Sequence, residues 1–234
     1  MCSSFVFSSS AAELRDCLST LGKVRDFFIY PKRKSVLHHQ IESSSEISSK
    51  KTLKRSCETR WIERFHAVND FIKLYNHVIE SLEIISEWVN SETSGKARTL
   101  RNAVLNLEFL VSLFVLNKGF SIGLPLSKLL QNPNIDLKVA VILANDTKQE
   151  LQDLRKNAEE VFKDIFGQVK ILAESFDIEI KMLRLSNRQI HRNNVPASSP
   201  EQFYRASIFI PYVDKFIKVI EELAKKKIRL PFSI

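Results

Sequence analysis

The sequence predicts an all-α protein, an irregular bundle of long helices, on three observations. The 234 residues include only 5 glycines and 7 prolines, which is few for the tight turns of most sheet-rich folds. Apolar residues recur at steps of three and four over long stretches, the spacing of one helical face. Few segments alternate between apolar and polar residues, as a half-buried strand would.

The overall composition is that of a globular protein. Hydrophobic residues make up 44% and charged residues 26%, which excludes a wholly disordered, collagenous or transmembrane chain. A chain of this length can bury a substantial core.

The first quarter of the chain predicts two helices and a loop. Residues 11–30 carry Leu14, Leu21 and Phe28 on one helical face, and Pro31 should end that helix. A short helix is predicted over residues 36–41. The serine-rich stretch 43–51 predicts a polar loop.

The middle of the chain predicts the centre of the bundle. One long helix should run from Thr59, its N-cap, to about Trp88, and residues 90–95 should end it. Residues 100–116 are apolar on most sides, as in a central buried helix. The most apolar stretch, 103–116, is shorter than the ~20 residues of a membrane span, so no membrane is expected as a partner. A turn over 118–125 and a short helix over 126–130 follow.

The clearest helical periodicity covers residues 137–176 and predicts one long helix, or two with a slight break. Its apolar stripe could form a coiled coil or receive a partner helix, but other helices are available to cover it, so packing within the chain is favoured. After a loop over 186–199, a final helix begins at Pro200, and Pro211 should kink it.

The predicted elements divide the chain into three parts. Residues 1–58 hold an N-terminal helix and a basic polar linker, and residues 59–185 hold the helical bundle. Residues 186–234 add a loop and a C-terminal helix to the same domain.

Positive charge is concentrated in two short stretches. The net charge is +8. Residues 32–64 contain nine basic and four acidic side chains, and residues 215–229 contain six and two. A basic surplus of this kind suits phosphate backbones or acidic protein surfaces as partners, and DNA is the partner we consider first.

The strongest candidate site is the pair Arg60 and Trp61, together with the nearby cations Lys54, Arg55 and Arg64. Basic side chains hold phosphates, and an indole can stack on an unstacked base. The alternative is that Trp61 is the first core residue of its helix and that the cations form a solvated face. The residue pattern alone favours this alternative.

Other motifs predict little chemistry. Gly119, Ser121 and Gly123 match G-x-S-x-G, and Asp177 and His191 follow in hydrolase order, but the chain lacks the strands that such a nucleophile elbow needs. A plain turn is favoured there. No paired Cys/His spacing indicates a metal site, and we expect no cofactor and no small-molecule substrate.

The cysteines and the N-terminus indicate the compartment. Cys2, Cys17 and Cys57 are odd in number and widely spaced, which suits a reducing compartment. The first ten residues do not form a signal peptide, so secretion is not expected. Basic runs at 31–34 and 50–55 are similar to a bipartite nuclear localisation signal, which favours the nucleus over the cytoplasm.

Several segments in order resemble hAT-superfamily transposases, particularly domesticated relatives of the zinc finger MYM-type protein 1-like kind. They are Val24-Arg25-Asp26-Phe27-Phe28 before Pro31, then Leu53 to Trp61 with Arg64, and later Leu126 to Gln131 and Arg205 to Tyr212 with Asp214. Together they cover nearly the whole chain. The part of the family that this chain resembles is the all-helical insertion domain.

The resemblance implies a non-catalytic role. In that family an RNase H-like core with two Asp and one Glu cuts DNA, and both Asp would lie before residue 1 and the Glu after residue 234. The resemblance also implies that Arg60 and Trp61 hold and stack on a flipped base in the parent enzyme. We therefore expect no enzymatic activity, residual nucleic-acid binding through the Arg-Trp region, and, as the alternative, a helical protein-interaction module.

Overall fold

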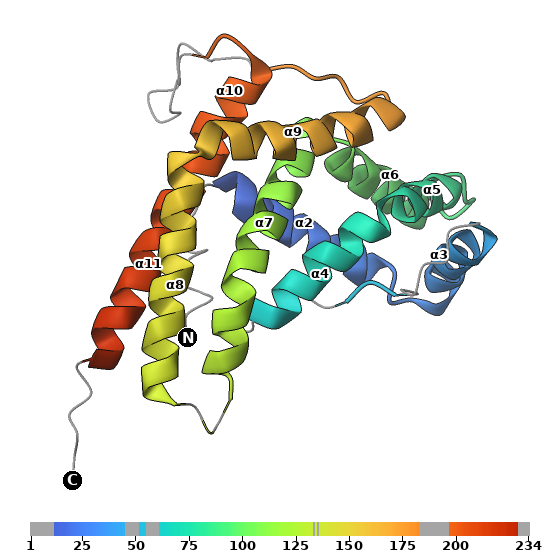
Figure 1. The fold of residues 1–234 in the computed structure, drawn as a ribbon. Coiled ribbons are helices and arrows are strands. Elements are labelled where there is room, and N and C mark those ends of the chain that lie inside the picture. Colours follow the sequence, from blue (N-terminus) through green and yellow to red (C-terminus); the bar gives the residue numbers. More distant parts are fainter. Residues whose placement is uncertain are drawn as a thin grey trace.

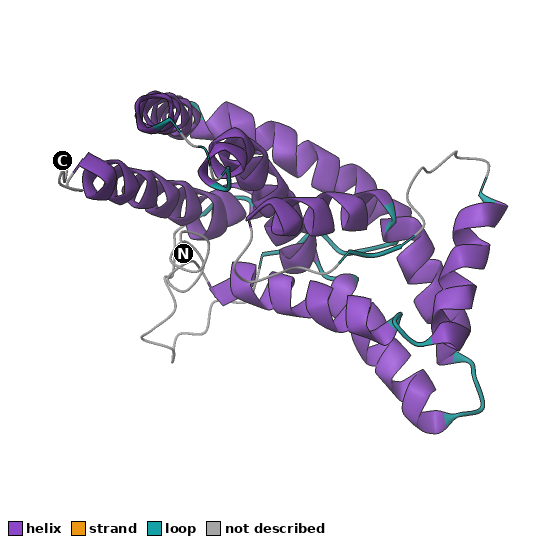
Figure 2. Cartoon of the chain, turned by 90° about the horizontal axis from the view of Figure 1, so that it is seen from below, coloured by secondary structure: helices purple, strands orange, loops and turns teal. Residues whose placement is uncertain are grey.

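The computed structural model describes residues 12–44, 52–54, 61–132, 134, 136–182 and 197–228. Within these ranges the chain forms helices and no strand (Figure 2), so the predicted all-α fold class is confirmed. The helices surround one apolar core to which every long helix contributes. Figure 1 shows α7 near the centre, α8 and α11 side by side at one edge, and α3, α5 and α6 at the other.

The N-terminal helix α2 (Ala12–Phe27) is confirmed, and it buries Leu14, Leu21 and Val24 against the core. Helix α3 (Pro31–Ser43) begins earlier than predicted, because Pro31 occupies its first turn. Proline suits that position, since its φ is already helical and its missing N–H would have no partner there. The predicted loop over 43–51 lies mostly outside the described residues.

The long helix predicted from Thr59 is two helices, α4 (Trp61–Lys73) and α5 (Tyr75–Ser86). They are separated at Leu74, a buried residue with φ −100° and ψ 6°. The break lets the two halves pack on different partners: α4 lies against α7, and α5 lies against α6 and α3. Thr59, the predicted N-cap, lies outside the described residues.

The next two helices correct the predicted boundaries. Helix α6 (Ser91–Val104) begins directly after Asn90, whose side chain accepts a hydrogen bond from Thr93 N–H, so the predicted break over 90–95 is shorter than expected. The helix predicted over 100–116 is divided between α6 and α7 (Leu107–Leu130). Asn106 separates them and caps α7 by accepting from Glu108 N–H.

Helix α7 continues through residues 118–125, so the predicted turn there is wrong, and exposed Pro125 lies inside the helix. Its length and apolar composition would allow it to cross a membrane, but 67% of its most apolar window is buried inside the protein. It packs against α2, α4, α8 and α9. The expectation of a buried central helix is confirmed.

The periodic stretch 137–176 forms two helices, α8 (Leu137–Lys156) and α9 (Ala158–Ser175), which meet at Asn157. The break is sharp, since α9 turns to cross one end of the bundle in Figure 1. Helices α7 and α11 (Ile210–Ile228) cover α8. The apolar stripe therefore packs within the chain, as favoured, and Leu151, Ile165 and Val169 on it are buried.

The final helical segment is interrupted before Pro211. Helix α10 (Pro200–Tyr204) leads into a π-helical turn, η1 (Arg205–Phe209), and then into α11. A proline cannot donate to the carbonyl four residues earlier, so an interruption of the α-helical pattern is expected at this place. Two ion pairs join α11 to α8: Asp214 to Arg155 at 2.7 Å and Glu221 to Lys148 at 3.1 Å.

Candidate nucleic-acid interface

The five predicted site residues are only partly within the described chain. Lys54 ends a short described segment, 52–54, and Trp61 and Arg64 lie in the first turn of α4. Arg55 and Arg60 lie outside the described residues. The geometry of the site is therefore that of three side chains.

Trp61 is buried, with 7% of its surface exposed. Its indole N–H donates to the backbone carbonyl of Phe120 on α7 at 3.2 Å. Its ring meets the Phe120 ring edge-on at 4.9 Å between centroids and the Phe216 ring of α11 at 5.0 Å. Trp61 thus occupies the position of a first core residue, and stacking on a base would require the indole to leave this packing.

Two glycines of α7 make room for these rings. A Cβ added at Gly123 would lie 2.7 Å from Trp61 Cζ2 and 2.9 Å from Phe216 Cζ. A Cβ added at Gly119 would overlap the Tyr212 ring. We call the surface formed by Gly119 and Gly123 the glycine notch. Four-residue spacing places both glycines on one face of a helix, where a missing side chain permits close approach.

The same motif does not form a nucleophile elbow. Ser121 is exposed in the middle of α7, and its hydroxyl donates to the Lys118 carbonyl at 2.7 Å. No strand occurs among the described residues, whereas an elbow requires one directly before the serine. Asp177 follows the end of α9, and His191 lies outside the described residues. Neither the elbow nor the favoured turn is present, because these residues are helical.

Arg64 is also part of the interior, with 6% of its surface exposed. It lies near Tyr212, where burial raises the pKa of the phenol and the positive charge of Arg64 acts in the opposite direction. A guanidinium in this position is not presented to a surface phosphate. Arg64 is therefore not one of the surface cations of the basic segment, although the sequence predicted it to be.

Lys54 is the exposed member of the three. Its side chain is 47% exposed, and its Nζ lies 3.8 Å from Oδ2 of Asp70, whose side chain is 1% exposed. This contact ties segment 52–54 to α4. An exposed ammonium beside a buried carboxylate keeps part of its surface available to solvent and to a ligand.

The second basic run, residues 31–34, has two kinds of cation. The Arg33 guanidinium lies over the Phe27 and Tyr30 rings at 4.4 and 4.5 Å, and it donates to the Phe27 carbonyl at 3.3 Å. Arg33 is thus held in the fold at the α2–α3 turn. Lys32 and Lys34 on either side of it are exposed.

Among the described residues, no group of three or more His, Cys, Asp or Glu side chains is placed to hold a metal ion. Cys17 is buried on α2, with its Sγ 3.8 Å from the Phe109 carbonyl oxygen, and burial raises the pKa of its thiol. Cys2 and Cys57 lie outside the described residues.

Comparison with known proteins finds distant relatives. The chain is 25% identical over 182 residues to the human 52 kDa repressor of the inhibitor of the protein kinase, an alignment covering 74% of this chain and 23% of that protein. The mouse protein of the same name is 24% identical over 219 residues, covering 88% of this chain and 28% of the relative. The chain thus spans about a quarter of the length of these relatives. No family model and no solved structure matches.

Proposed function

We propose that this chain is a non-catalytic helical domain of a protein derived from a hAT-type transposase, acting in the nucleus, and that it binds nucleic acid through its basic segment from Lys54 to Arg64. The resemblance of its ordered segments to that superfamily supports the origin. Two distant relatives align with most of this chain over about a quarter of their own length, which supports the proposal of a domain within a longer protein.

One observation carries the binding proposal. Thr52 and Leu53, which directly precede Lys54, line the same surface pocket as Arg25 and Lys34. The described segment 52–54 and the first basic run, which are separate in the sequence, therefore lie beside each other in the fold. Adjacent exposed cations raise the local positive potential and attract a phosphate backbone more strongly than scattered ones.

The buried residues take a different role in this proposal. Trp61 anchors the start of α4 through its hydrogen bond to Phe120 and its ring contacts. Arg64 lies one helical turn further on and is buried too. Both position the end of the basic segment, while Lys54 and the neighbouring Arg55 and Arg60 contact phosphates.

The alternative function, a protein-interaction module that recognises a partner helix through residues 137–176, has less support. Helices α7 and α11 already cover α8, and two ion pairs, Arg155 to Asp214 and Lys148 to Glu221, hold α11 in place. A partner helix would first have to displace α11.

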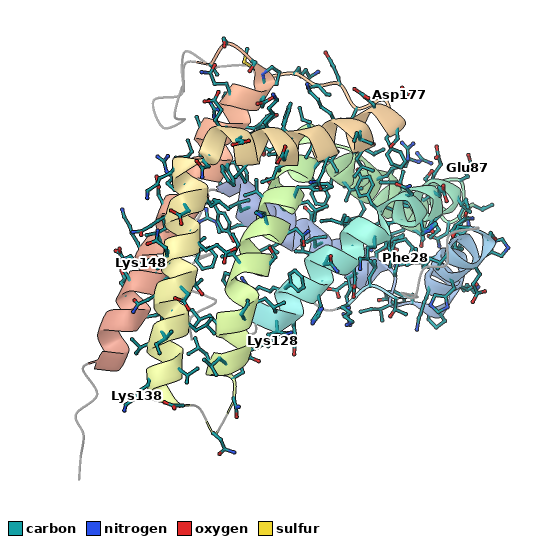
Figure 3. The ribbon with its side chains drawn as sticks, viewed as in Figure 1. Phe28, Glu87, Lys128, Lys138, Lys148 and Asp177 are labelled. Atoms are coloured by element: carbon teal, nitrogen blue, oxygen red, sulfur yellow. The ribbon has the colours of Figure 1, made fainter. Side chains whose placement is uncertain are left out.

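Salt-dependent binding to short single-stranded and hairpin DNA tests the proposal. The variant Lys54→Gln/Arg55→Gln/Arg60→Gln should reduce the slope of log affinity against log salt by about 2, since each lost phosphate contact removes ~0.7–0.9. The control Lys128→Gln/Lys138→Gln/Lys156→Gln removes equal charge from exposed positions on α7 and α8; Lys128 and Lys138 are labelled in Figure 3.

The outcomes separate the roles of the residues. Equal slopes for the two triple variants would contradict binding through the basic segment. Trp61→Phe keeps an aromatic ring that can anchor the start of α4, so the affinity of the folded protein should change little. A large loss of single-strand affinity with Trp61→Phe, at matched folding, would instead assign base stacking to the indole.

A further inference from the structure

A pocket of about 270 Å³ opens at the α2–α3 turn, beside segment 52–54. Phe28, labelled in Figure 3, lies at this turn. The walls combine apolar and polar side chains from three parts of the chain. The lining residues are Arg25, Phe28, Ile29, Lys34, Leu37, His38, Thr52 and Leu53.

The apolar part of the pocket is firmly held. Phe28 and Leu37 belong to the buried core, and the Phe28 ring meets the Phe27 ring edge-on at 5.4 Å between centroids. Ile29, which is 51% exposed, and half-buried Leu53 complete this side. A ligand with an apolar part can therefore contact a preformed wall, as in most small binding sites.

The polar part carries positive charge. Lys34 is exposed and forms no ion pair with any described residue. The Arg25 guanidinium forms an ion pair with Oδ1 of Asp26 at 2.7 Å. Its side chain is still partly exposed, and Arg25 lines the pocket. Thr52 adds a hydroxyl. No carboxylate is among the lining side chains, so the pocket favours an anion.

His38 adds an unused hydrogen-bonding atom. Its Nε2 is buried, and no hydrogen-bond partner meets it within the part of the chain that the structure describes. Buried polar nitrogens are almost always paired in folded proteins, and this unpaired one belongs to a residue that lines the pocket. The oxygens of an anion in the pocket would accept hydrogen bonds from the His38 ring and from Lys34 or Arg25.

We propose that this pocket binds one phosphate of a nucleic-acid strand, with the oxygens held by Lys34, Arg25 and His38 and the sugar against Ile29 and Leu53. The inference rests on the proposed function, because the pocket is continuous with the basic segment that begins at Lys54. It adds a defined phosphate position, formed by α2 and α3, that lies outside the Arg-Trp region.

Matched pairs of variants on α3 test it. Lys34→Gln and Lys32→Gln remove the same charge from exposed positions, but only Lys34 lines the pocket. His38→Gln and His39→Gln make the same comparison for neighbouring histidines, of which His39 is exposed and hydrogen-bonds with Ser43. Affinity for short single-stranded DNA should fall about tenfold for Lys34→Gln and His38→Gln, the effect of one charge-assisted hydrogen bond. The two controls should change it about twofold or less.

Two-dimensional NMR of the histidine rings gives a second measurement that needs no variant. Adding DNA or inorganic phosphate should shift the His38 ring signals and leave those of His39 nearly unchanged. Far-UV circular dichroism of each variant verifies folding, and exposed Lys34 can be replaced without disturbing the core.

Each outcome decides a different statement. If wild type binds DNA but each pocket variant equals its control, the pocket inference is overturned and the proposed function stands. If wild type shows no salt-dependent DNA binding, both fail. If inorganic phosphate or a phosphorylated peptide shifts the His38 signals and DNA does not, the pocket serves another phosphate source and the inference is overturned.

Discussion

Replacing Gly123 by alanine should destabilise this protein, although the same change usually stabilises a helix. Alanine is favoured over glycine inside a helix by about 0.8–1.0 kcal/mol. At Gly123, however, the new Cβ would lie 2.7 Å from Trp61 Cζ2 and 2.9 Å from Phe216 Cζ. Carbon atoms pack at about 3.5–4.0 Å, so the Trp61 ring must move away by about 0.8 Å or more and the Phe216 ring by about 0.6 Å or more.

The retreat is costly because Trp61 is held from several sides. Its N–H donates to the Phe120 carbonyl, and Phe120 and Phe216 contact its ring. Overpacking a core of this kind costs about 1–3 kcal/mol, and weakening the hydrogen bond adds about 1 kcal/mol. After subtracting the helix-propensity gain, we expect Gly123→Ala to lose ~1–3 kcal/mol of unfolding free energy.

Gly167→Ala is the matched control. Gly167 lies inside α9, and a Cβ there would meet nothing within 4 Å. It should gain about 1 kcal/mol, so the two variants should shift the urea midpoint in opposite directions with unchanged m-values. In a thermal melt Gly167→Ala should raise the midpoint by ~2–4 °C and Gly123→Ala should lower it by ~2–12 °C.

Far-UV circular dichroism is the suitable probe, since Trp61 fluorescence reports the altered contact itself. A Gly123→Ala midpoint at or above that of wild type would refute the close-packing argument. The double variant Gly123→Ala/Trp61→Phe should lose less unfolding free energy than the two single variants lose together, because the smaller ring leaves room for the methyl group.

The remaining predictions concern stability. Trp61→Phe alone should cost about 1–2 kcal/mol in urea unfolding, since it removes the hydrogen bond to Phe120 and part of the buried ring; an unchanged midpoint would contradict the core role. Asp177 lies just after the C-cap of α9 at φ 52°, a conformation that favours glycine, so Asp177→Gly should raise the free energy of unfolding by up to ~1 kcal/mol, whereas Asp153→Gly inside α8 should lower it. Burial raises the pKa of Tyr75, Tyr204 and Tyr212 in the folded protein. These phenols therefore lose their protons at lower pH in the unfolded chain than in the folded protein, and the free energy of unfolding should fall as the pH rises above about 10. Absorbance at the tyrosinate wavelength should then increase together with the loss of helical signal. The triple variant Tyr75→Phe/Tyr204→Phe/Tyr212→Phe identifies the part of this absorbance that the three residues contribute. If that part increases before the helical signal is lost, the burial of the three phenols is contradicted.

The fold class could be predicted from the sequence because periodicity reports which side of a helix is buried. The stripe that includes Leu151 and Val169 was assigned correctly on this basis. Helix boundaries were less predictable, since they depend on partners. Leu74 is compatible with a continuous helix, and the chain breaks there because α4 and α5 pack on different neighbours.

Residues 118–125 show the opposite error. Two glycines and a proline within eight residues are typical of a turn, yet they belong to α7. The reason is tertiary: Gly119 and Gly123 accept rings from α4 and α11, and those contacts are invisible in a local window.

The candidate site was predictable in its charge and not in its exposure. Lys54 is exposed, as expected of a basic segment, whereas Trp61 and Arg64 are interior. A tryptophan at the start of an amphipathic helix has the same sequence pattern in both cases. The pocket that includes Arg25 and His38 could not be found from the sequence, because it is formed where α2, α3 and segment 52–54 meet in the fold.

The ring contacts around the glycine notch can form only in a fixed order during synthesis. Trp61 comes from the first third of the chain, Gly123 from its middle and Phe216 from near its end. On a ribosome, α4 and α7 emerge long before the residue that closes their contact. Contacts between such distant positions form late, so Trp61 can pack against Phe120 of α7 early, while its contact with Phe216 waits for α11.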